Sequence, residues 1–173
     1  MRNIHYTVIT VLITCLSICS LQAQGFEREH KLLGIGVGIG NGNFPFGVHF
    51  ESGIADQISV GGFAGYSSYS SQLSNIRYIL ASARGSYHFG NHFDGLDDVW
   101  DLYGGLSLYY LNTSSNTTSS NPFLGTEASR SSRGSMGLAI FLGARYFFSD
   151  QMGVFAELGT GLAWIQVGLA VKL

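Results

Sequence analysis

The amino-acid sequence predicts an all-β protein, an eight-stranded antiparallel up-and-down barrel that crosses a membrane with its strands. Three observations support this fold class. Apolar residues return at every second position from Lys31 to the end of the chain, which is the period of strands whose two faces meet different surroundings. The alternate positions hold mostly Gly, Ser, Ala and Tyr rather than Lys and Glu. The repeating segments number eight, and bacterial transmembrane barrels have an even number of strands.

The composition excludes several other classes of protein. With 173 residues, 12% charged residues and a net charge of −2, the chain fits one folded domain and neither a disordered nor a nucleic-acid-binding protein. Beyond Ser20 no apolar run approaches the roughly 18 residues that a membrane-spanning helix needs. We therefore expect no helical anchor after that point.

Residues 1–23 are predicted to be a secretory signal peptide. Arg2 supplies a positive start, residues 8–16 are almost entirely apolar, and residues 21–23 end in the small residue that precedes a cleavage site. A retained anchor helix is disfavoured because the apolar stretch is too short. Residues 24–173 then form an exported barrel domain.

The two cysteines, Cys15 and Cys19, both lie in the segment expected to be removed. Neither follows the small residue that a lipoprotein signal requires, since Thr14 and Ile18 precede them. The mature chain would therefore enter an oxidising compartment without a thiol, which excludes disulfides, zinc-thiolate sites and cysteine nucleophiles.

The first four strands follow in order from the alternation. Residues 33–40 alternate aliphatic residues with glycines, and residues 48–54 lead to a compact turn at 55–57. The third strand, residues 58–67, begins directly after that turn, and residues 79–89 form the fourth. The aspartate in the turn is typical of tight connections.

The last four strands are predicted at residues 100–110, 138–148, 152–160 and 165–173. Most of the eight are near the 9 to 11 residues that a tilted strand needs to cross a bilayer. Residues 112–134 are rich in Ser, Thr and Asn and are predicted to be a long polar loop. Short turns on one side and a longer loop on the other are typical of an outer-membrane barrel with its short turns in the periplasm.

The face opposite the apolar one is predicted to line a narrow, filled lumen. Its small residues leave room for a few large ones in an eight-stranded barrel, and its charges are balanced, as buried charges that need partners should be. Arg145 and Glu157 flank one tight turn, so we expect them to bond diagonally across paired strands. This packing role is favoured over an ion or proton pathway. The predicted lumen charge network comprises Glu51, Arg84, Asp101, Arg145, Glu157 and Lys172.

Aromatic residues gather toward the ends of the predicted strands, on or beside the apolar face. Such residues form girdles at the two interfaces of a membrane. Ordinary β-propensity also enriches aromatic residues in strands, but it does not favour strand ends. The predicted girdle residues are Tyr66, Tyr87, Phe89, Trp100, Tyr110, Tyr146, Phe148 and Trp164.

Three segments, residues 82–89, 142–148 and 155–173, resemble small outer-membrane β-barrel proteins of Gram-negative bacteria. The resemblance is to the OmpA transmembrane domain and the OmpX-like group, especially Bacteroidota-type members, and it extends over nearly the whole mature chain. It implies an eight-stranded barrel in the outer membrane, in contact with lipid and assembled by the barrel-assembly machinery through its C-terminal strand. Family members usually end in an aromatic residue, whereas this chain stops at Leu173.

Some barrels of this kind modify lipid A with a histidine, a serine and an acidic residue, so the histidines are candidates for catalysis. His49 is the best of them, with Glu51 on the same face and Ser67 on the neighbouring predicted strand at a comparable height. His88 lies toward a periplasmic turn. The alternative reading of His49 is a satisfied lumen histidine. We expect no catalytic residues, and the sequence shows no metal-ligand spacing and no cofactor motif.

The sequence thus predicts a non-enzymatic, monomeric outer-membrane barrel that serves envelope structure or meets a surface partner through residues 112–134. Three alternatives stay open. One is a lipid A modifying enzyme, a second is a soluble periplasmic barrel that binds a small apolar ligand inside, and a third is a minor pore. A closed barrel leaves no unpaired strand edge in lipid, and this favours the first interpretation.

Overall fold

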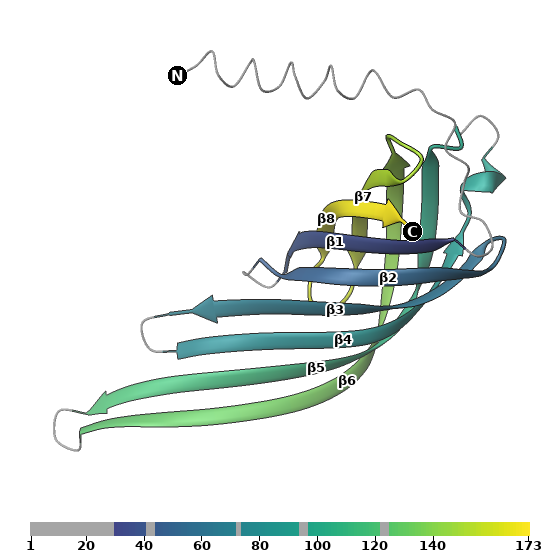
Figure 1. The fold of residues 1–173 in the computed structure, drawn as a ribbon. Coiled ribbons are helices and arrows are strands. Elements are labelled where there is room, and N and C mark those ends of the chain that lie inside the picture. The colour runs from purple at the N-terminus through teal and green to yellow at the C-terminus, as the bar shows by residue number, and fades with distance from the viewer. Residues whose placement is uncertain (1–29, 41–43, 72–73, 94–96, 122–124) are drawn as a thin grey trace, which may run out of the picture.

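A computed structural model describes residues 30–40, 44–71, 74–93, 97–121 and 125–173. The predicted signal peptide lies outside this range. The described chain forms a closed barrel of eight strands in sequence order, drawn in Figure 1. The strands are β1 (Lys31–Ile39), β2 (Phe46–Ala55), β3 (Ile58–Ser70), β4 (Ser74–His88), β5 (Trp100–Asn121), β6 (Gly125–Phe147), β7 (Met152–Gly159) and β8 (Ile165–Lys172), with one short 3-10 helix, η1 (Gly90–His92).

All neighbouring strands are antiparallel, and the barrel closes where β1 pairs with β8 from Leu32 opposite Lys172 to Ile39 opposite Ile165. The predicted fold class is therefore confirmed. Among the described residues, no helix is long and apolar enough to span a membrane.

The strand faces are arranged with aliphatic side chains outward and small or polar ones inward. In β1 every residue alternates between exposed and buried, and Ile35 and Val37 are exposed while the glycines between them are buried. The pattern follows from the two-residue period of a strand. Large side chains then need small neighbours in the lumen: a Cβ on Gly34 would fall on the His49 ring, and one on Gly143 would fall on the Tyr103 ring.

One predicted element is wrong. Residues 112–121 and 125–134 are strands and not a loop, because β5 and β6 stay paired from Trp100 opposite Tyr146 to Asn121 opposite Gly125. The sequence pattern did not predict these strands because their residues are polar on both faces. A sheet with water on both faces needs no apolar alternation. Its backbone hydrogen bonds hold it together, and threonine has good β-propensity.

The strands of the barrel consequently differ in length, and they end at different heights on the side away from the tight turns. β3 and β4 also run past the predicted limits, pairing up to Ser70 opposite Asn75, whereas the pairing of β6 with β7 stops at Phe141 opposite Gly159. Strands β3 to β6 therefore continue beyond the barrel as a protruding sheet, with the β5–β6 hairpin reaching furthest (Figure 1).

The opposite end of the barrel, where the chain makes its tight turns, is closed by a small apolar core. Leu32, Phe147, Phe155 and Ala170 are buried together, with Val99 packed against them. We call this cluster the apolar plug. It occupies the closed end of the barrel interior, and the charged residues occupy the lumen between the plug and the open end.

Candidate functional site

Arg145 of β6 is the most enclosed cation of the described lumen, with no exposed surface. Its Nη2 donates to Glu51 Oε2 at 2.7 Å and its Nη1 donates to Asp101 Oδ2 at 2.8 Å. The guanidinium also lies 3.8 Å from the centre of the Tyr103 ring. Two carboxylates and an aromatic face thus compensate one buried charge, as burial demands.

Arg84 of β4 continues this array toward the open end of the barrel. Its Nη2 donates to Glu157 Oε2 at 2.7 Å, and its Nε lies 3.5 Å from Glu51 Oε1. The Phe141 ring stacks on the guanidinium at 3.9 Å. Glu51 therefore lies between both arginines, and the ion pairs run in one line from Glu157 to Asp101.

The partners differ from those predicted. Arg145 lies opposite Phe155 in the register and Glu157 lies opposite Gly143, and the two do not pair with one another: Glu157 accepts from Arg84 and from the Tyr103 hydroxyl at 3.2 Å. In a lumen this narrow, long side chains reach across the barrel, so strand neighbours do not decide the pairing. The ammonium of Lys172 lies 4.1 Å from the centre of the Phe147 ring, at the apolar plug.

Asp101, at the closed end of the row of ion pairs, also belongs to a hydrogen-bonded array with His88 and Ser59 that the sequence did not predict. His88 Nε2 lies 2.9 Å from Ser59 Oγ, and His88 Nδ1 lies 2.7 Å from Asp101 Oδ1. This order of groups resembles that of serine hydrolases. Ser59, however, has no exposed surface among the described residues, and it does not line the two pockets described below.

A strand map would have revealed this array. Ser59 pairs with Ser86 in the hairpin of β3 and β4, and His88 is two residues further along the same face. Diagonal neighbours on one face are within reach of long side chains. The missing information was the register.

The predicted group of His49, Glu51 and Ser67 is not brought together. His49 lies opposite Phe63, and Ser67 is four residues further along β3, about 13 Å at the rise of a strand. Among the described residues, neither His49 Nε2 nor Ser67 Oγ has a hydrogen-bond partner. The His49 ring packs edge-on against Phe155 with ring centres 4.9 Å apart. The expected common height of His49 and Ser67 is therefore wrong.

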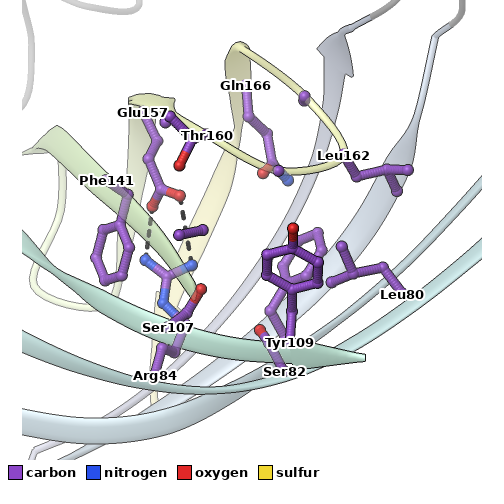
Figure 2. Close-up of a pocket in the computed structure, with 15 residues that line it drawn as sticks. Leu80, Ser82, Arg84, Ser107, Tyr109, Phe141, Glu157, Thr160, Leu162 and Gln166 are labelled. Carbon is purple, nitrogen blue, oxygen red and sulfur yellow. Dashed lines mark hydrogen bonds and ion pairs between the residues drawn. The ribbon is translucent and has the colours of Figure 1, made fainter. Parts of the chain in front are cut away.

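A cavity of about 60 Å³ lies above the ion pairs. Figure 2 shows Arg84 and Glu157 bonded on one side of it, with Tyr109 and Leu80 on the other. Residues 160–163, which belong to the connection between β7 and β8, also line the cavity. At about 30 Å³ per water, the space suits only a very few water molecules. Little space is thus left in this part of the described lumen, in keeping with the narrow interior of an eight-stranded barrel.

The connection at residues 160–163 comes close to β1 because β1 has glycines there. A Cβ on Gly38 would lie 2.6 Å from the Ala163 Cβ, and one on Gly40 would fall on the Leu162 carbonyl oxygen. Gly161 has a φ of 156°, which suits glycine better than other residues. Leu162 thereby lines the cavity, on the side away from Arg84 and Glu157 (Figure 2).

The aromatic residues predicted for the girdles lie at both ends of the barrel. Tyr87, Trp100, Tyr110 and Trp164 are exposed, and the other four, Tyr66, Phe89, Tyr146 and Phe148, are partly buried. Trp100 and Tyr146 face one another in the register with ring centres 4.9 Å apart. Both lie at the end with the tight turns.

Comparisons with known proteins agree with this geometry at the level of the fold. No protein-family model and no curated protein sequence matches the chain. The N-terminal β-barrel domain of OprF from Pseudomonas aeruginosa is similar with a TM-score of 0.57, at 16% identity over 84% of this chain and 98% of that one.

Two further solved structures are similar to the same degree. The outer membrane protein OprG from Pseudomonas aeruginosa has a TM-score of 0.56, at 15% identity over 87% of this chain and 99% of that one. Neisserial surface protein A has a TM-score of 0.55, at 15% identity over 83% of this chain and 95% of that one. The chain therefore has the fold of small eight-stranded outer-membrane barrels.

Proposed function

We propose that this chain is a non-enzymatic integral protein of the outer membrane of a Gram-negative bacterium, and that its protruding sheet binds a protein partner at the cell surface. The barrel would be the anchor and the β5–β6 hairpin the interaction surface. The observation that carries the proposal is the open edge of β6 above the barrel.

The outward face of the barrel supports the location in a membrane. Leu138, Met136 and Leu106 are exposed by 76%, 71% and 62%, and similar aliphatic side chains surround the wall. Soluble monomers rarely expose contiguous apolar surface of this extent. A soluble barrel for apolar ligands would need these faces reversed, whereas this lumen is lined with ion pairs.

The edge of β6 begins where β7 ends. Thr160 N donates to the Ile140 carbonyl at 3.0 Å, and Ile140 N donates to Thr160 Oγ1 at 3.1 Å. Beyond this contact the described register of β6 has a strand on the β5 side only. Because alternate residues of an antiparallel strand direct their main-chain groups to the same side, Leu138, Met136 and Ser132 direct theirs to the open side.

Such an edge is a template for an added strand. Many recognition domains bind an extended segment in this way, through main-chain hydrogen bonds. Arg130 and Arg133 are exposed on this part of β6, so the added strand would carry acidic side chains. No catalytic group is required.

The experiment has two stages. First, heat-dependent gel mobility of protein extracted from outer membranes tests whether a closed barrel lies there. Second, a photo-crosslinking amino acid at Ser132 is activated in intact cells, in the otherwise native chain and with Gly134→Pro, which removes an edge N–H. Gly134→Ala, which keeps that N–H, is the matched control.

A discrete protein adduct that survives Gly134→Ala and disappears with Gly134→Pro would support binding along the edge. The surface interaction would be refuted if no adduct formed, or if the adduct formed equally well with Gly134→Pro. Protein found soluble in the periplasm would refute the membrane anchor itself.

A further inference from the structure

We propose that the outward face of β3 to β6 binds a phosphorylated glycolipid of the outer leaflet, with acyl chains in an apolar groove and a phosphate on Arg77. This inference rests on the proposed outer-membrane location. It concerns a different surface from the β6 edge.

The groove is a hollow of about 580 Å³ on the outside of the barrel. It is far larger than the cavity of the lumen, and its surface is almost entirely apolar. The floor consists of small outward-facing residues of β3 and β4: Gly62, Ala64, Ala81 and Ala83. The walls are large side chains from the strands on either side: Leu33, Val48, Phe50, Leu108, Tyr110 and Met136.

Packing within the chain explains the outward glycines of β3 and β4 only in part. A Cβ on Gly62 would be tight against the Ser82 carbonyl oxygen at 3.3 Å, but at Gly85, the next outward residue of β4 beyond Ala83, it would meet nothing within 4 Å. In the lumen, by contrast, a Cβ on Gly143 would fall on the Tyr103 ring. Glycine weakens a strand interior, and it often marks a close approach from outside.

A cation, Arg77, lies beyond the groove on the side away from the closed end of the barrel. Arg77 is two residues beyond Ile79 on the outward face of β4, about 7 Å further from the barrel's closed end. Tyr110, at the rim of the groove, is an exposed aromatic residue of the kind found at membrane interfaces. The guanidinium of Arg77 is exposed and forms no ion pair with a described side chain.

The surroundings of Arg77 favour a phosphorylated sugar. In the register it lies beside Ser68 of β3 and Ser114 of β5, and Ser132 of β6 continues the row. Arg130 is on the same face of β6, one step further out. Arginine binds phosphate through two parallel hydrogen bonds, and hydroxyl side chains suit the hydroxyls of a sugar.

The charge distribution distinguishes the two ends of the barrel. The described charged side chains of the protruding sheet are Arg77, Arg130 and Arg133, and the sequence adds one acid, Glu127, further along β6. The tight-turn end instead has four aspartates, Asp56, Asp97, Asp98 and Asp150, against two lysines, Lys31 and Lys172. The described side chains are therefore mainly cationic on the protruding sheet and mainly anionic at the tight turns, which favours an anionic lipid at the protruding sheet.

The test measures binding of bisphosphorylated lipid A to the purified barrel in detergent by native mass spectrometry. Dephosphorylated lipid A and phosphatidylglycerol are the comparison ligands. The variants are Arg77→Ala, which removes the cation, and Ala83→Phe, which fills the groove. Arg133→Ala, on the other face of the sheet, is the matched control. Heat-dependent gel mobility verifies that each variant folds.

We expect bisphosphorylated lipid A to bind, with about tenfold loss in Arg77→Ala, the order expected for one charge-assisted contact. Ala83→Phe should lose binding similarly, and Arg133→Ala should keep it. Equal binding of phosphatidylglycerol, or of dephosphorylated lipid A, would overturn the glycolipid assignment, as would variants without effect. A barrel that is present in outer membranes yet fails to bind lipid A refutes this inference alone, whereas absence from that membrane refutes the proposed location.

Discussion

Arg145 and Glu51 form an ion pair across the full width of the barrel, with Nη2 to Oε2 at 2.7 Å and no exposed surface on either side chain. They belong to β6 and β2, which are four strands apart in a ring of eight. The pair therefore ties opposite walls together. Asp101 on the same guanidinium and Arg84 beside the same carboxylate extend the tie to β5 and β4.

Removing one partner of this pair should destabilise the barrel strongly. Glu51→Gln leaves two guanidiniums without the carboxylate between them, and breaking a buried pair costs about 3–5 kcal/mol. Urea unfolding in lipid vesicles, followed by tryptophan fluorescence, measures the change. The exposed Lys31→Gln is the control and should change the free energy of unfolding by under about 0.5 kcal/mol. Equal stability of Glu51→Gln and the parent would contradict a structural role for the pair.

Replacing a glycine by alanine should lower the stability of the barrel when the glycine faces the lumen, but not when it faces outward. Gly143→Ala sets a methyl group against the Tyr103 ring and should cost about 1–3 kcal/mol through overpacking. Gly85→Ala meets open space and should be neutral or stabilise by up to about 1 kcal/mol. The same unfolding assay in vesicles compares both variants, and a similar loss in the two would show that outward packing matters as much as the lumen.

Shortening the hairpin should leave the barrel intact. Ser115 lies opposite Ser131, so joining them through Asn-Gly in place of residues 116–130 preserves the remaining register, and Asn-Gly favours a two-residue hairpin turn. The heat-dependent gel shift should persist because closure depends on β1 and β8. Loss of that shift would mean that the hairpin is needed for assembly.

The array of Ser59, His88 and Asp101 should prove structural. Ser59→Ala removes one partner of a buried imidazole and should cost about 1–3 kcal/mol, while the lipid A mass spectrum of cells stays unchanged. His49→Ala should likewise leave lipid A unchanged. A shift in lipid A mass that depends on either residue, with the barrel still folded by gel mobility, would replace the interaction protein with an enzyme.

The alternation of residues by itself determined the barrel and its orientation of faces. A strand has a period of two, and in a membrane the apolar face must be outward, so the inward placement of Glu51, Arg84 and Arg145 follows from their positions in the sequence. The same reasoning failed for residues 112–121 and 125–134, because strands with water on both faces have no alternation to detect.

Only the tertiary structure decided which inward residues meet. The strand order of an up-and-down barrel follows from the sequence, but the stagger of the strands and the reach of side chains across a narrow lumen do not. Because of the stagger and this reach, Arg145 does not pair with Glu157, and Ser67 lies far from His49. The same two factors bring Ser59, His88 and Asp101 together. The open edge of β6 has the same origin: it exists because β7 ends at Gly159 while β6 begins at Gly125, a mismatch in length that becomes an exposed edge only when the strands are paired.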